Sequence, residues 1–108
     1  MPSTNNKVVF PDSDEIAHML KALGHPVRLR MVCELICRDA CCCGEMCDCF
    51  TLSQSTVSQH LSVLKEAGIV TSKADGTKSA FSIDRDTIRR LQDGLEIMFS
   101  GSGKCCDD

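Results

Sequence analysis

Apolar residues recur at the period of an α-helix in the first third of the chain. After Asp14 the apolar positions fall three, four and seven residues after the first of them, and Gly24 ends the pattern. Such spacing predicts an amphipathic helix whose apolar stripe faces another surface. The stripe consists of Ile16, Met19, Leu20 and Leu23.

Pro26 suits the first turn of a second helix, which we expect to run to about Cys37. Its apolar stripe is predicted at Leu29, Val32, Cys33 and Ile36. Cys33 lies on that stripe, so it is interpreted as a small buried core residue.

Residues 38–43 are expected to form a connection, and residues 44–50 a short helix. Ser53 is a plausible N-cap for a longer helix over residues 54–67, which Gly68 closes. Three apolar residues of this longer helix are expected to face inward, namely Val57, Leu61 and Leu64.

The pattern then changes to β. Residues 69–73 and 78–83 are rich in β-forming residues and flank Asp75-Gly76, a strong hairpin signal. Asp84 or Asp86 can cap a last amphipathic helix. Its apolar side is expected to carry Ile88, Leu91, Leu95, Met98 and Phe99.

The expected fold is therefore mainly α with a β-hairpin wing, a winged helix-turn-helix with its elements in the order ααααββα. Residues 1–13 are polar and contain Pro, which indicates a mobile arm. Residues 14–99 form the folded domain, and residues 100–108 form a flexible tail that contains cysteine.

A short helix, a tight turn and a helix with a small polar outer face are typical of a helix-turn-helix, whose second helix enters the DNA major groove. The hairpin that follows would place lysines near phosphates. An ordinary amphipathic helix with a solvated outer face explains the periodicity about equally well. The candidate DNA-binding residues are Gln54, Ser55, Thr56, Ser58, Gln59, His60, Lys65, Lys73 and Lys78.

The composition restricts the number of domains and the cellular compartment. The chain has 108 residues, 43% of them hydrophobic, with no Trp or Tyr, which suits one helical domain. No apolar run reaches the roughly 18 residues of a membrane span, and the N-terminus lacks the pattern of a signal peptide. We therefore expect a cytoplasmic protein with no membrane partner.

The net charge is −3, but residues 20–92 carry +2, which permits nucleic-acid binding.

Two segments carry a resemblance to a known family. The runs KALGHPVRLRMV (Lys21–Val32) and LSQSTVSQHLSVLKEAGIVTSKADGTKSAFSI (Leu52–Ile83) closely resemble the arsenical-resistance repressor (ArsR/SmtB) family. The resemblance implies a transcriptional repressor, not an enzyme, that binds double-stranded operator DNA as a homodimer until an inducer binds. It also implies dimerisation through the first and last helices, using Ile16, Met19, Leu20, Leu23, Ile88, Leu91, Leu95, Met98 and Phe99.

In a reducing cytoplasm, nine cysteines indicate free thiols, metal ligands or redox groups rather than a disulfide scaffold. They cluster at Cys41-Cys42-Cys43 and Cys105-Cys106. Soft thiolates suit trivalent arsenic or antimony, so As(III) or Sb(III) is the expected inducer, with no organic cofactor. A helix N-terminus beside residues 41–43 favours thiolates there, although Glu45 and Asp48 oppose this effect.

The family's C-V-C-D-L arsenite motif falls on residues 42–46, where Gly44 replaces its second cysteine. Cys43, Cys47 or Cys49 could supply the missing ligand. The expected ligands are thus Cys105, Cys106, Cys42 and Cys43, followed by Cys37, Cys41, Cys47 and Cys49.

Three alternatives stay open at this point. The same fold could sense thiol oxidation, or it could sense Cd, Pb or Zn. A structural zinc module over residues 37–49 is weaker, because its cysteines are too crowded for good tetrahedral geometry. The last helix also lacks the His of relatives that bind zinc there.

Overall fold

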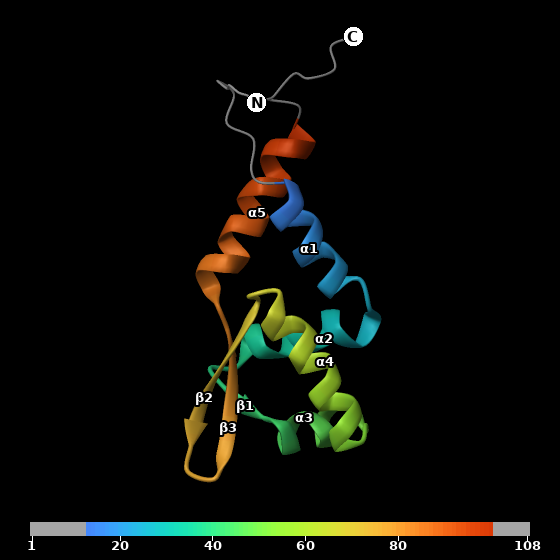
Figure 1. Ribbon diagram of the computed structural model, residues 1–108, viewed down its shortest axis with the longest axis vertical. Helices are drawn as coiled ribbons and strands as arrows, with labels where there is room; N and C mark the ends of the chain where they lie inside the picture. Colours follow the sequence, from blue (N-terminus) through green and yellow to red (C-terminus); the bar gives the residue numbers. More distant parts are fainter. Residues whose placement is uncertain (1–12, 101–108) are drawn as a thin grey trace.

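The computed structural model describes residues 13–100, which form five helices and three strands. The predicted fold class is confirmed, since the helices and the hairpin follow one another in the predicted order (Figure 1). The elements are α1 (Ser13–Leu23), α2 (Pro26–Cys37), β1 (Cys41–Cys42), α3 (Cys43–Phe50), α4 (Gln54–Glu66), β2 (Val70–Asp75), β3 (Lys78–Ile83) and α5 (Arg85–Ser100). The predicted ligands Cys105 and Cys106 lie outside the described residues.

A short third strand, β1, was not predicted. The sheet has the order β1-β3-β2, and both pairings are antiparallel. Cys41 lies opposite Phe81 and Cys42 opposite Ala80, so part of the expected connection over residues 38–43 is a strand. Two residues are too few to show an alternating pattern, and only the partner strand defines β1.

The core lies where α1, α2, α3 and α4 meet the base of the hairpin. Its fully buried side chains are apolar, and those of α4 match the prediction. Burying a side chain of this size contributes about 1.5–3 kcal/mol to folding. The largest members are Met19, Met31, Leu35, Met46, Val57, Leu61, Leu64, Ile69 and Val70.

The predicted apolar stripe of α2 is wrong at three of its four positions. Leu29 and Ile36 are 48% and 39% exposed, and Cys33 is exposed as well. Instead α2 buries Met31, Val32 and Leu35 against its neighbours. Leu35 follows Met31 by one helical turn, so both residues face the core.

Helices α1 and α5 lie side by side at the end of the molecule away from the wing (Figure 1). Arg90 joins them through an ion pair with Glu15 at 2.9 Å. Asp84, rather than Asp86, caps α5, since its Oδ1 accepts the Thr87 N–H at 3.2 Å. Arg85 ties the start of α5 to the Ile36 carbonyl at 3.1 Å.

The apolar residues predicted for a dimer interface divide into two groups. Ile16, Met19 and Leu91 are buried within one protomer, so they are not exposed for contact with a second copy. Leu20 and Phe99 are 42% and 81% exposed. The remaining four are half-buried and pack against the core, namely Leu23, Ile88, Leu95 and Met98. Dimerisation itself stays a prediction.

The corrected face of α2 can be tested by truncating one residue on each side. We expect Leu35→Ala to lower the free energy of unfolding by about 2–5 kcal/mol, because it leaves a cavity in the core. Leu29→Ala should lower it far less, since Leu29 is half exposed. Urea denaturation at fixed protein concentration measures both changes, and equal losses would contradict the observed orientation of α2.

Candidate nucleic-acid interface and adjoining thiols

The turn between α3 and α4 has the geometry of a helix-turn-helix. Thr51 ends α3 with a left-handed backbone (φ 57°), and its N–H donates to the Cys47 carbonyl. Ser53 then caps α4, because its hydroxyl accepts the Thr56 N–H at 3.3 Å. The same hydroxyl donates to Thr56 Oγ1 at 2.9 Å. Thr56 is therefore half-buried within the cap and less available to DNA than its neighbours.

The outer face of α4 is polar and open to solvent. Five of the predicted DNA-binding residues lie exposed on it, and Ser62 joins them. Lys73 and Lys78 are exposed on the wing, whose turn places Gly76 at a positive φ of 66°. The exposed predicted residues of α4 are Gln54, Ser55, Ser58, Gln59 and Lys65.

His60, a predicted DNA-binding residue, contacts two residues near the start of α2. Its ring lies 4.6 Å from that of His25, and Arg28 Nη1 lies 3.4 Å from its Nδ1. Burial lowers the pKa of His60, and the neighbouring His25 and Arg28 lower it further, which favours the neutral form of the ring. His25 Nδ1 also accepts the Val27 N–H at 3.1 Å and caps α2.

These contacts connect the start of α2 to the middle of α4. Arg28 completes the connection by donating through Nε to the Ala22 carbonyl at 2.6 Å. Sequence patterns alone assign no role to His25 or Arg28 in positioning α4. Their one signal in the sequence is that both lie in the GHPVR run of the resembling segment.

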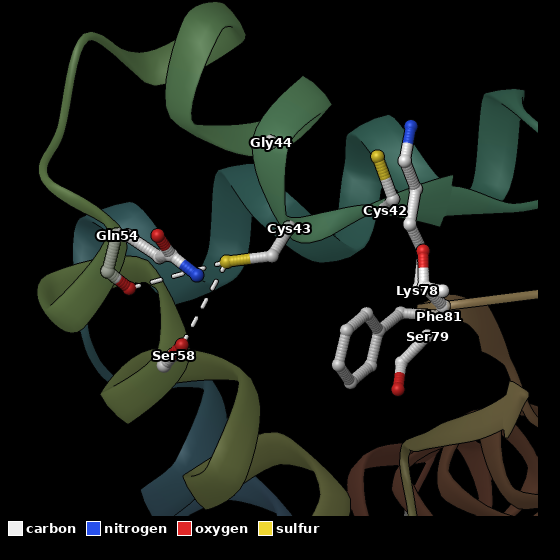
Figure 2. A pocket seen from close by; sticks show the side chains of 9 residues that line it. Cys42, Cys43, Gly44, Gln54, Ser58, Lys78, Ser79 and Phe81 are labelled. Carbon is white, nitrogen blue, oxygen red and sulfur yellow. Dashed lines mark hydrogen bonds between the residues drawn. The ribbon is translucent and has the colours of Figure 1, made fainter.

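A pocket of about 380 Å³ lies between the start of α3, the first turns of α4 and the wing. Figure 2 shows the Cys43 side chain pointing from α3 toward Gln54 and Ser58 of α4. Its Sγ lies 3.7 Å from Ser58 Oγ and 3.9 Å from the Gln54 carbonyl oxygen. Cys42 also lines the pocket, but its side chain points in another direction. A thiol thus touches the helix predicted to read DNA.

The thiols around α3 have different environments. Cys41 is buried under β3, and this burial raises the pKa of its thiol to about 11. The negative charge of Glu45 adds to that shift, whereas Arg38, with Nη1 3.7 Å from the sulfur, opposes it. The expectation that the cluster is biased toward thiolates is therefore wrong for Cys41.

Cys47 follows Cys43 by one helical turn, so both lie on one side of α3. Burial raises the pKa of Cys47, and the neighbouring Cys43 raises it further. Cys49 is exposed on another side of the same helix. At Gly44 an added Cβ would meet only Cys42 Sγ, at 3.9 Å, so the position lost from the family motif has room for a side chain.

These thiols do not form a complete three-ligand site by themselves. Within residues 13–100, no three His, Cys, Asp or Glu side chains are placed to hold one metal ion. Cys43 and Cys47 supply two thiols on one face of α3, which fits part of the donor set that trivalent arsenic needs.

Among the described helices, none is long and apolar enough to cross a membrane.

Comparisons with known proteins agree with this geometry. A family model described as "Bacterial regulatory protein, arsR family" matches residues 25–72. The chain is 33% identical over 92 residues to the biofilm growth-associated repressor of Xylella fastidiosa, covering 85% of this chain and 80% of that protein. It is 32% identical over 89 residues to the arsenical resistance operon repressor of Bacillus subtilis, covering 80% and 85%.

Solved structures show the same fold. A crystal structure described as a possible transcriptional regulator for arsenical resistance matches with a TM-score of 0.69 and 29% identity. It covers 76% of this chain and 84% of that chain. Reduced HlyU from Vibrio cholerae matches with a TM-score of 0.64 and 26% identity, covering 81% and 90%.

The buried environment of Cys41 predicts low reactivity. With its pKa near 11, about one Cys41 thiol in a thousand is ionised at pH 8. Iodoacetamide should therefore modify exposed Cys49 much faster than Cys41. Peptide mass spectrometry of briefly treated protein measures both, and guanidinium should make their rates similar. Equal rates in the folded protein would contradict the buried position of Cys41.

Proposed function

Because the chain belongs to the ArsR family of bacterial regulatory proteins, we propose that it is a repressor released from DNA by trivalent arsenic or antimony. The repressor binds operator DNA as a homodimer, and the metalloid binds cysteine thiolates beside the recognition helix. The observation that carries this proposal is the contact between Cys43 Sγ and two residues of α4, Ser58 and Gln54. A ligand that takes this sulfur must change a contact made by the recognition helix.

The exposed face of α4 supplies the chemistry needed for DNA. Gln can form paired hydrogen bonds with adenine, and Ser can bond to bases or phosphates. Gln54, Ser55, Ser58 and Gln59 lie near the start of the helix, the end that reaches base edges in this motif. Lys65 on α4 and the wing lysines Lys73 and Lys78 contact phosphates.

The dimer would form through α1 and α5. Phe99 and Leu20 expose large apolar surfaces on these helices, and a second copy would cover them. Leu95 and Met98 are half-buried on the same helix as Phe99 and extend that surface. Two copies would set their α4 helices at the spacing of two DNA half-sites.

The ligand set combines α3 with the tail. Cys43 and Cys47 provide two thiols from one face of α3, and these lose their protons when the metalloid binds. Cys42 lines the same pocket as Cys43. Trivalent arsenic or antimony takes three sulfurs, so the third comes from Cys42, or from Cys105 or Cys106 of either copy. The metalloid binds the DNA-free conformation more tightly, and this differential affinity lowers operator affinity.

Removing one wing lysine tests the DNA contact. Lys78→Ala should weaken binding to operator and unrelated DNA alike, and should reduce the slope of log affinity against log salt by about one. Lys21→Ala is the matched control, since Lys21 is exposed on α1. Figure 1 shows that α1 lies away from the wing. Fluorescence anisotropy at several salt concentrations measures both. An unchanged slope for Lys78→Ala would remove this lysine from the interface.

Substituting thiols on α3 tests metalloid release. Cys43→Ser should raise the arsenite or antimonite concentration that releases half of the DNA by at least about tenfold. This change corresponds to ~1.4 kcal/mol of the coupling free energy between metalloid binding and DNA binding. Cys49→Ser should leave it unchanged, because Cys49 is exposed on another side of α3. Gly44→Cys should lower it, since the new side chain would lie beside Cys42. The measurement is DNA anisotropy under a phosphine reductant.

Further arms of the same assay separate the remaining possibilities. Cys105→Ser with Cys106→Ser should blunt release while leaving DNA binding intact. If the two tail substitutions together have no effect, the third thiol is that of Cys42. Release by peroxide, or by Cd²⁺, Pb²⁺ or Zn²⁺ at lower concentration than arsenite, would identify the alternative inducers instead.

A further inference from the structure

Helix α2 exposes two thiols on one side. Cys33 and Cys37 are both exposed, and they are four residues apart on a regular helix. Side chains at this spacing lie one above the other on the helix surface. Within residues 13–100 neither sulfur has a hydrogen-bond or ion-pair partner, so neither thiol has a packing role that explains it.

Their surroundings are apolar. Leu29 lies one turn before Cys33, and Ile36 lies three residues after it, and both are unusually exposed for their size. A groove of about 210 Å³ begins at Ile36 and runs between α2 and α5. Ile83 and Ile88 line it together with Arg85, Arg89 and Gln92. The two thiols do not line this groove themselves, but Ile36, their neighbour on α2, does.

The number of thiols restricts the ligand. Inorganic arsenite takes three sulfurs, and two thiols leave one position of the arsenic unsatisfied. A trivalent arsenical that already carries one organic substituent needs only two. Two neighbouring thiols bind such a ligand as a chelate, because the second bond forms intramolecularly.

We infer that Cys33 and Cys37 form a second site, selective for monosubstituted trivalent organoarsenicals. The arsenical, R–As(OH)₂, reacts with both thiols to give R–As(S–Cys)₂ and two water molecules. Arsenic stays trivalent, so no oxidant or reductant is needed. The substituent R lies against Ile36 and extends into the groove toward Ile88.

This site lies on a different helix from the thiols of the proposed function, although it responds to the same class of element. Cys33 and Cys37 lie on α2, whereas Cys43 and Cys47 lie on α3. The two sites can therefore be tested separately.

The sequence provides a direct readout in the full-length protein. Trypsin cleaves after Arg30 and Arg38, and the peptide Met31–Arg38 contains Cys33 and Cys37 but no other cysteine. Phenylarsine oxide is the probe, added to folded protein kept reduced by a phosphine. Free thiols are then blocked with iodoacetamide, the arsenical is removed with a dithiol, and the released thiols are labelled with N-ethylmaleimide.

We expect the peptide to carry either two iodoacetamide labels or two maleimide labels, because chelation protects both thiols in the same molecule. Cys33→Ser should reduce protection of Cys37 by at least about a hundredfold in probe concentration, since only a single thiol remains. Arsenite in place of phenylarsine oxide should protect the pair much more weakly. Independent labelling of the two thiols, or unchanged protection in Cys33→Ser, would overturn the inference.

A variant isolates the site from the other ligands. Cys42, Cys43, Cys47, Cys49, Cys105 and Cys106 are replaced by Ser, while buried Cys41 is kept. Native mass spectrometry should still show one phenylarsine per chain, and adding Cys37→Ser should abolish it. Circular dichroism verifies folding, and the labelling of the full-length protein decides the question if this variant does not fold. In this variant the proposed function predicts that arsenite no longer releases DNA, and the present inference predicts that phenylarsine still binds. Retained arsenite-driven release would therefore contradict the proposed function alone, and lost phenylarsine binding would contradict this inference alone.

Discussion

Within residues 13–100, one apolar core positions the recognition helix and the thiols beside it. Met31 and Leu35 of α2 pack with Leu61 and Leu64 of α4, and all four are fully buried. This packing turns the polar face of α4 outward and fixes the side of α3 that meets it. Because buried surfaces provide most of the stability, a change in this core would displace the recognition helix and the thiol beside it together.

The cysteines differ in burial, contacts and reactivity because each lies in a different environment. Cys41 pairs with β3 and is buried, so its thiol stays protonated at neutral pH. Its neighbour Cys43 is partly exposed and contacts α4. Cys33 and Cys37 stand on an exposed helix face. Reactivity toward soft ligands depends on thiolate character and access, so proximity in sequence does not make these cysteines equivalent.

A second connection links α4 to the rest of the domain. The rings of His25 and His60 are in contact, and Arg28 joins His60 to the end of α1 through the Ala22 carbonyl. This polar cluster lies at the opposite end of α2 from Cys37. The recognition helix is thus held from two sides, by the His25–Arg28–His60 cluster and by the thiol of Cys43. A change at either contact can shift α4, which suits a helix whose position must respond to a ligand.

The sequence by itself determined the order of the helices, the hairpin, the cap at Ser53 and the inward side of α4, because each depends on local pattern. Only the tertiary structure revealed β1, since a two-residue strand exists through its partner β3. It also decided which side of α2 is buried. Leu29, Cys33 and Ile36 repeat at the helical period, as do Met31 and Leu35, and periodicity cannot choose between two such sides. The elements packed against α2 decide which side is buried, and they leave Cys33 exposed although the sequence pattern had indicated a buried core residue.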